Sequence, residues 1–193
     1  MRQRTNDSNS VSEELSDKEL LERFRNPDTR NYSFNLLIRK YQKKVYWHVR
    51  RLVIVHDDAD DVTQETFVKV WKHLDSFKEQ SQLFTWIYRI ATNEAISFLR
   101  KKRTRFFIPM IQVERKLART LKDDNFFNGD EIQLKLQQAI LKLPEKQRIV
   151  FNMKYYDELK YEEMSEVLGT SVGALKASYH HAVKKIEEHI KTQ

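Results

Sequence analysis

The chain contains no cysteine, and this absence removes several kinds of chemistry at once. Disulfide bonds, thiol catalysis and cysteine-ligated zinc sites all require that residue. The N-terminal segment also lacks the apolar stretch of a signal peptide, and no apolar run approaches the roughly 18 residues of a membrane span. We therefore expect a protein of the reducing cytoplasm that is neither exported nor inserted into a membrane.

Glycine and proline are also scarce, with three of each among 193 residues. This scarcity argues against a turn-rich β-sandwich and favours long helices. The 40% of hydrophobic residues are enough for real cores, while the 33% of charged residues predict a highly charged surface. We therefore predict an all-α protein.

The charge balance is basic, with a formal net charge of +7. Clustered lysines and arginines gain affinity for nucleic acids by releasing counterions from the phosphates. The composition therefore indicates a polyanionic partner, for which nucleic acid and an acidic membrane surface are the two alternatives.

Apolar periodicity predicts a first helical module over residues 16–105, preceded by a polar, disordered tail over residues 1–15. Ser16 and Glu19 have the spacing of a capping box at a helix start, and the turn at 26–28 ends that first short helix.

Three longer helices complete this module. The first carries apolar residues from Phe34 to Leu52, and residues 56–61 interrupt the pattern after it. The second runs through residues 62–74. The third begins near Leu83 and ends in the basic run 100–105, where the helix dipole favours cations.

A linker is predicted over residues 106–130, followed by a second helical module over 131–193. Its first helix stops at Pro144, which also begins the next helix. Residues 161–176 then have the pattern of helix, tight turn and helix, because Gly169 can adopt a positive φ and Thr170 or Ser171 can cap the final helix.

A helix of this kind fits the major groove of DNA, where its first turns reach base edges. The alternative is an ordinary helical hairpin with a basic, solvated face. Adjacent His180 and His181 suggest a metal, yet neighbours on a helix project about 100° apart and do not readily share one ion. We predict no metal site.

The run 57–71 places an acidic patch at a helix N-terminus, where simple capping and solvation would also explain the carboxylates. No nucleophile, base or phosphate-binding loop accompanies them. We predict no catalytic residues, no cofactor and no enzymatic activity.

Three motifs in register resemble the extracytoplasmic-function (ECF) sigma factors of the sigma-70 family. They are DDVTQETF at 60–67, FTWIYRIATN at 84–93, and Leu143-Pro144 followed by the helix-turn-helix. The resemblance extends over roughly residues 19–190. It implies that 16–105 form sigma domain 2, a helical bundle, and 131–193 sigma domain 4, joined by a flexible linker.

The resemblance implies specific contacts for each module. The acidic helix would dock on the clamp helices of the largest subunit of core RNA polymerase, through Asp60, Asp61, Gln64 and Glu65. The loop after the acidic helix and the helix beyond it would capture a flipped base at the minus-10 element and help to melt the promoter, through Phe77, Lys78, Gln80, Ser81, Trp86, Tyr88, Arg89, Asn93, Ser97 and Arg100.

Some of these residues have a second interpretation. Trp86 falls near the apolar stripe and could serve the core, whereas Tyr88 and Arg89 fall outside it and are expected to be freer. The run 100–105 could be a generic basic helix end instead of a contact to the DNA backbone.

By the same resemblance, the minus-35 element would be read by Ser171, Lys176, Ser178, His180, His181 and Lys184. Family members commonly carry arginines at several of these positions. Lysine lacks the rigid bidentate fork that arginine offers to guanine, so an atypical promoter or a weaker upstream contact is expected.

The function implied is that of a sigma factor, which directs core RNA polymerase to promoter DNA and has no chemistry of its own. The resemblance also implies an anti-sigma factor as a partner. The alternative is a stand-alone helix-turn-helix regulator that binds duplex DNA without polymerase, which would leave the acidic helix and the aromatic loop unexplained.

Overall fold

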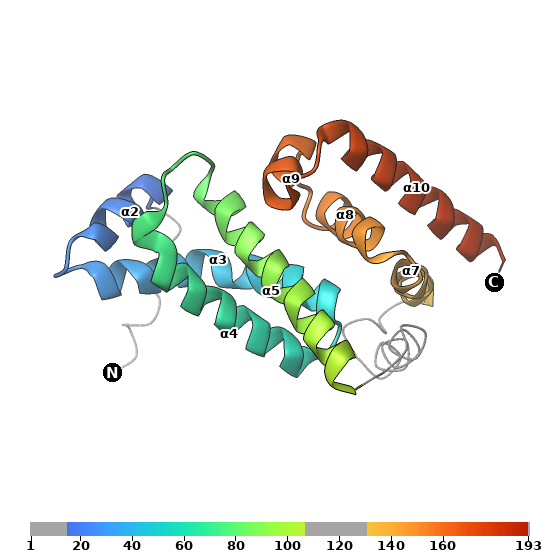
Figure 1. The fold of residues 1–193 in the computed structure, drawn as a ribbon, viewed down its shortest axis with the longest axis horizontal. Helices are drawn as coiled ribbons and strands as arrows, with labels where there is room; N and C mark the ends of the chain where they lie inside the picture. The colour runs from blue at the N-terminus through green and yellow to red at the C-terminus, as the bar shows by residue number, and fades with distance from the viewer. Residues whose placement is uncertain (1–14, 107–130, 193) are drawn as a thin grey trace.

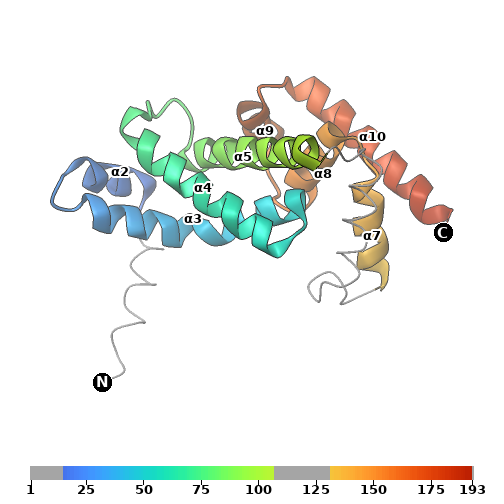
Figure 2. The ribbon, with the colours of Figure 1, turned by 60° about the horizontal axis from the view of Figure 1, so that its bottom comes forward.

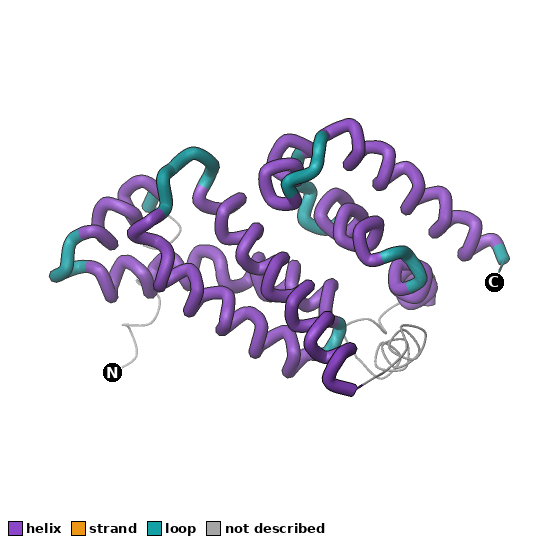
Figure 3. The backbone as a smooth tube through the Cα atoms, in the orientation of Figure 1, coloured by secondary structure: helices purple, strands orange, loops and turns teal. Residues whose placement is uncertain are grey.

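A computed structural model describes residues 15–106 and 131–192, with the side chains of 103–106 left undescribed. The expected tail at 1–15 lies outside this range except for its last residue, and the expected linker at 106–130 lies outside it except for its first. Every regular element of the described residues is helical (Figure 3), which confirms the all-α prediction.

Four α-helices form the N-terminal module (Figure 1). They are α2 (Asp17–Arg25), α3 (Arg30–Val53), α4 (His56–His73) and α5 (Leu83–Phe106), with the short 3-10 helix η1 (Leu74–Ser76) after α4. The helices α3, α4 and α5 pack pairwise against one another, while α2 packs on the start of α3.

The C-terminal module consists of α7 (Glu131–Leu141), α8 (Glu145–Tyr155), α9 (Tyr161–Leu168) and α10 (Val172–Lys191). The long α10 packs along α7, α8 and α9. Two helical modules are therefore present, as predicted.

Local sequence signals define several helix ends. The Ser16 hydroxyl accepts a hydrogen bond from the Glu19 amide at 3.3 Å, and the Glu19 carboxylate accepts one from the Ser16 amide at 2.8 Å. This is the predicted capping box, and its hydrogen bonds hold the pKa of Glu19 below its ordinary value. Pro144 is the residue immediately before α8, whose first turn begins at Glu145.

The start of α4 differs from the prediction. Residues 56–61 do not interrupt the helical pattern, because α4 already begins at His56 and contains the acidic run. Asp57 and Asp58 lie in its first turn, where carboxylates interact favourably with the free amides and the helix dipole. The apolar pattern lapses there only because these turns are polar.

An aromatic cluster joins the first three helices of the N-terminal module. The Trp71 ring of α4 lies edge-on to Phe24 of α2 and Phe34 of α3, with centroids 5.3 and 4.8 Å away. The Arg30 guanidinium lies 4.1 Å above the Phe24 ring and also pairs with Asp75. Edge-to-face pairs of this kind add to the stabilisation from apolar burial.

The two modules lie against each other, with α8 packed on α3 and α9 packed on α5 (Figures 1 and 2). One continuous buried cluster includes residues of both, among them Val49 and Ala91 from the N-terminal module and Met153 and Met164 from the C-terminal one. A second, smaller cluster lies between α7, α8 and α10.

Candidate nucleic-acid interface

The helix-turn-helix is built as the sequence predicts. Gly169 ends α9 in the left-handed region at φ 61°, and its amide donates to the Ser165 carbonyl. Of the two expected caps, Ser171 is the one used: its hydroxyl accepts a hydrogen bond from the Ala174 amide at 3.4 Å. The first turn of α10 lies at the surface, since Gly173 and Ala174 are exposed, and its backbone can approach a ligand.

Most residues predicted to read the minus-35 element share the exposed side of this unit, namely Ser171, Lys176, His180, His181 and Lys184. The Lys176 ammonium lies 5.7 Å from the ring centre of Tyr161 on α9, a cation–π contact that restricts where it points. Ser178 differs from the others, since it is half-buried and lines a cavity between the modules.

A polar stripe runs along α5. Residues spaced by three and four positions lie on one side of a helix, and Arg89, Asn93, Ser97 and Arg100 follow that spacing and are all exposed. Trp86 begins the same stripe and is half-buried. The helix therefore presents one aromatic and several polar groups along a single side.

An aromatic pair, Phe77 and Trp86, packs beneath the loop between η1 and α5. Phe77 is buried and its ring centre lies 5.0 Å from that of Trp86, whereas Lys78 and Gln80 are exposed and Ser81 is half-buried. Phe77 is thus buried beneath the surface and packs against the Trp86 ring. Because Trp86 is itself half-buried, it belongs in part to the core and in part to the surface.

The same loop is tied to α2 by a contact that the sequence analysis missed. Glu79 adopts a positive φ of 55°, and its carboxylate pairs with the Arg25 guanidinium at 2.6 Å. A left-handed conformation is uncommon outside glycine. The ion pair therefore links this loop to α2.

The prediction that Tyr88 and Arg89 are freer than Trp86 is wrong for Tyr88, while Arg89 is exposed. Tyr88 is 2% exposed, its hydroxyl donates to the Lys44 carbonyl, and its ring packs on His48 and Phe84. Burial raises the pKa of Tyr88. Position 88 lies on the side of α5 that faces α3, so this residue supports the stripe from inside.

The acidic side of α4 is exposed as expected for Asp61, Gln64 and Glu65, while Asp60 is half-buried beside His56. Val68 shares this side, because it lies seven residues after Asp61, and it is 44% exposed. Sequence reasoning missed Val68. The signal was available, since this apolar residue falls on the polar side of an amphipathic helix.

Within the described residues, no group of three or more histidine, aspartate or glutamate side chains is placed to hold a metal ion. No helix in the same part of the chain is both long enough and apolar enough to cross a membrane.

Comparison with known families assigns both modules. The model of Sigma-70 region 2 matches residues 37–105, and that of Sigma-70 region 4 matches residues 133–186. The first match contains the acidic helix, the loop and the α5 stripe, and the second contains the helix-turn-helix.

Curated relatives match over nearly the whole chain. The ECF RNA polymerase sigma-E factors of Salmonella typhimurium and Escherichia coli are 32% identical over 188 residues, covering 93% of this chain and 97% of each relative. The ECF RNA polymerase sigma factor SigW of Bacillus subtilis is 30% identical over 159 residues, covering 78% of this chain and 85% of the relative.

Two solved structures share the fold. CnrH, in complex with the cytosolic domain of CnrY, has a TM-score of 0.68 at 22% identity and covers 92% of this chain and 98% of its own. RpoE from Bartonella quintana, in complex with the anti-sigma factor NepR, has a TM-score of 0.62 at 22% identity and covers 82% of this chain and 96% of its own. With both sigma regions matched in order and relatives aligned along most of its length, this chain belongs to the ECF sigma factors of the sigma-70 family.

Proposed function

We propose that this sigma factor binds core RNA polymerase through α4, opens promoter DNA at the minus-10 element with the α5 stripe and its loop, and reads the minus-35 element with α10. The observation that carries the proposal is the presence in one chain of two different exposed polar surfaces, the α5 stripe and the start of α10, each within a matching sigma region. A stand-alone regulator needs only the second.

The docking surface on α4 consists of Asp60, Asp61, Gln64, Glu65 and Val68. Its carboxylates suit a basic partner, because complementary charge orients the encounter and speeds association. Val68 adds apolar area at the C-terminal end of that surface, and its burial on docking would contribute to binding.

Strand opening requires a base to leave its stack, which costs a few kcal/mol. Trp86, backed by Phe77, offers a ring on which an extruded base can stack, and each stacked base gains about 1–3 kcal/mol. Lys78, Gln80 and Asn93 are the exposed polar groups for the edges and backbone of the non-template strand. The gain from stacking is thus of the size needed to offset the extrusion.

Upstream recognition falls to the exposed side of α10. Its N-terminal amides suit a phosphate, while Lys176, His180, His181 and Lys184 provide cationic or hydrogen-bonding groups along the next turns. Histidine and lysine replace the arginines that commonly read this element, which favours upstream contacts made mainly to the backbone.

Several features follow from this assignment as parts of the same proposal. The protein acts in the cytoplasm, has no catalytic residues and needs no cofactor, since the polymerase makes the phosphodiester bonds. An anti-sigma factor is a further proposed partner, because Bartonella quintana RpoE was solved with one.

The test is promoter-directed transcription by the purified chain and core RNA polymerase. Added together, they should yield run-off transcripts from a defined subset of a promoter library, whereas either alone should yield none. A chain that binds duplex DNA but supports no initiation would instead be a stand-alone regulator.

Charge reversal tests the docking surface separately. Asp61→Lys should weaken core binding by at least about tenfold, because a like charge placed opposite a basic surface costs several kcal/mol. The matched control is Glu22→Lys, the same reversal at an exposed position of α2. Fluorescence anisotropy of labelled chain with core enzyme measures both, and equal effects would reject α4 as the docking site.

A further inference from the structure

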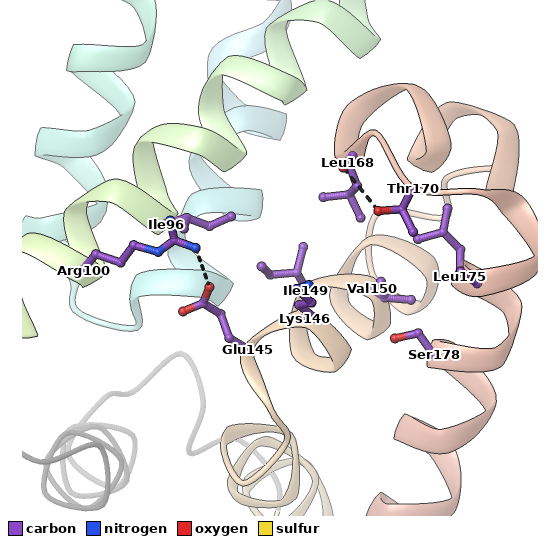
Figure 4. A pocket seen from close by; sticks show the side chains of 11 residues that line it. Ile96, Arg100, Glu145, Lys146, Ile149, Val150, Leu168, Thr170, Leu175 and Ser178 are labelled. Carbon is purple, nitrogen blue, oxygen red and sulfur yellow. Dashed lines mark hydrogen bonds and ion pairs between the residues drawn. The ribbon is translucent and has the colours of Figure 1, made fainter.

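Two of the cavities between the modules differ in the chemistry of their walls. The first, of about 430 Å³, is drawn in Figure 4. Its Arg100 already pairs with Glu145 at 3.5 Å, and aliphatic side chains such as Ile96 and Leu168 form much of the remaining wall. This cavity is therefore mainly aliphatic, and its arginine is already paired.

The second cavity, of about 380 Å³, is lined by four aromatic rings, three cations and one carboxylate, and we call it the aromatic cavity. Its wall comes from α3, the first turns of α5 and the connection between α8 and α9. Small-molecule sites in proteins occupy about 300–1,000 Å³. The aromatic cavity lies at the lower end of that range and has room for one small ligand.

The four rings come from three separate elements: Trp47 of α3, Phe84 and Tyr88 of α5, and Tyr156 of the connection. Tyr88 is buried, whereas the other three are half-buried and keep part of their surface exposed. The ring centres of Phe84 and Tyr88 lie 4.2 Å apart. Bases of every kind stack on aromatic side chains, because each base has a π-face. The rings therefore suit a flat heterocyclic ligand.

The charge available to a ligand comes from Lys43 and Lys44, which are adjacent, exposed residues of α3. In the described parts of the chain, neither ammonium forms an ion pair with a carboxylate. The Lys44 ammonium lies 5.8 Å from the ring centre of Phe84, so positive charge and aromatic surface adjoin. Lysine binds phosphate as a point charge. A phosphate held by these lysines would leave an attached base beside the rings.

The carboxylate of the wall, Asp157, does not oppose an anion, because Arg51 already neutralises it. The Asp157 side chain is 3% exposed, its Oδ2 lies 2.7 Å from His48 Nδ1, and its Oδ1 accepts from Arg51 Nη1 at 2.9 Å. Burial also raises the pKa of Tyr156 to about 12, so this phenol stays neutral at ordinary pH. The wall of the aromatic cavity therefore keeps a net positive charge.

We propose that the aromatic cavity binds a free nucleoside phosphate, with the base against its rings and the phosphates at Lys43 and Lys44. A cavity with room for one ligand favours a free nucleotide over a nucleic-acid strand, which needs a continuous groove. The inference does not rest on the proposed function, since this binding requires neither promoter DNA nor polymerase.

Isothermal titration calorimetry of the full chain with ATP, adenosine and tripolyphosphate tests the assignment. ATP carries both a base and phosphates, whereas each of the other two carries one of these groups. ATP should bind about tenfold more tightly than either, because adenosine lacks the phosphate contacts and tripolyphosphate lacks the stacking. Equal binding of tripolyphosphate would show only attraction of anions to a basic protein, and that result, equal binding of adenosine, or no binding of ATP would overturn the inference.

Charge removal then locates the phosphates. The double variant Lys43→Gln, Lys44→Gln should weaken ATP binding on the order of tenfold, since two ion pairs are lost. The matched control, Lys18→Gln with Lys72→Gln, removes the same charge from exposed positions of α2 and α4. Equal losses of ATP affinity in the two double variants would overturn the inference. A single-stranded oligonucleotide of mixed sequence should bind both equally, and a selective loss by the first would assign its lysines to a nucleic-acid strand instead.

Tryptophan emission locates the base independently of the lysines. The chain has three tryptophans, and ATP stacked beside Trp47 should quench part of their emission. Trp47→Phe should abolish that quench while ATP still binds, because the substitution retains a ring. A quench that survives Trp47→Phe would place ATP at Trp71 or Trp86 and overturn the inference. None of these readouts involves polymerase, so failure here and failure of the run-off test are distinguishable.

Discussion

Two glycines four residues apart should respond to alanine with opposite signs. Gly169 lies at φ 61° in the turn, whereas Gly173 lies in the first turn of α10 with ordinary helical geometry. A Cβ built at either position meets nothing within 4 Å. Steric contacts are thereby removed from the comparison, and the backbone conformation alone decides the outcome.

The magnitudes follow from backbone energetics. A left-handed conformation costs an L-residue about 1–2 kcal/mol, and the lower entropy of the unfolded alanine chain offsets about 0.4–1 kcal/mol of that. Gly169→Ala should therefore lower the free energy of unfolding by about 1 kcal/mol. Gly173→Ala has no strain to overcome and should raise it by about 0.5 kcal/mol.

Urea unfolding followed by circular dichroism measures both variants against the parent chain. Hydrogen exchange of the α9 and α10 amides then locates the change at the turn. If Gly169→Ala is as stable as the parent, or if the two substitutions act in the same direction, the left-handed turn between α9 and α10 is refuted as the reason for glycine at position 169.

Three other substitutions test separate parts of the account. Lys176→Ala should weaken binding to duplex DNA and lower the slope of log affinity against log salt concentration by about one, as measured by filter binding at several salt concentrations. Affinity for core RNA polymerase should stay unchanged, and its loss would contradict a role of Lys176 in upstream DNA contact. Ser16→Ala should cost about 1 kcal/mol in urea unfolding. Because the pKa of Glu19 is depressed, the contribution of its carboxylate is present above the ordinary value of 4.5 and is lost as the pH falls through the lower folded pKa. The cost of Ser16→Ala should therefore shrink in acid to the share of the Glu19 amide hydrogen bond, and a cost that does not shrink would contradict the contact between the Ser16 hydroxyl and the Glu19 carboxylate. Asn93→Ala should reduce promoter opening more than duplex binding, and equal losses in footprinting and mobility shift would place Asn93 outside the melting site.

Local signals explain why so much of the fold was predictable. The capping box at Ser16 and the turn at Gly169 depend on residues within a few positions of each other, and both formed as predicted. The start of α4 was missed because acidic first turns break an apolar pattern without breaking a helix.

Long-range contacts explain the remainder. His48 and Asp157 are 109 residues apart in the chain, and neither carries a motif that pairs them. Tyr88 was wrongly predicted to be exposed because apolar periodicity identifies a single stripe of the helix. In the structure α3 covers a wider part of the α5 surface than that stripe, and Tyr88 lies within it. Helix type and caps can thus be read locally, while the packing between modules depends on the whole fold.

The most direct test of the central claim is permanganate footprinting of a promoter selected in the run-off assay. With core polymerase and the parent chain, thymines near the start site should become reactive because they are unpaired, and Trp86→Ala should sharply reduce that reactivity while duplex binding persists. Thymines that stay unreactive with the parent chain, or that react equally with core enzyme alone, would contradict the claim that this protein opens promoter DNA.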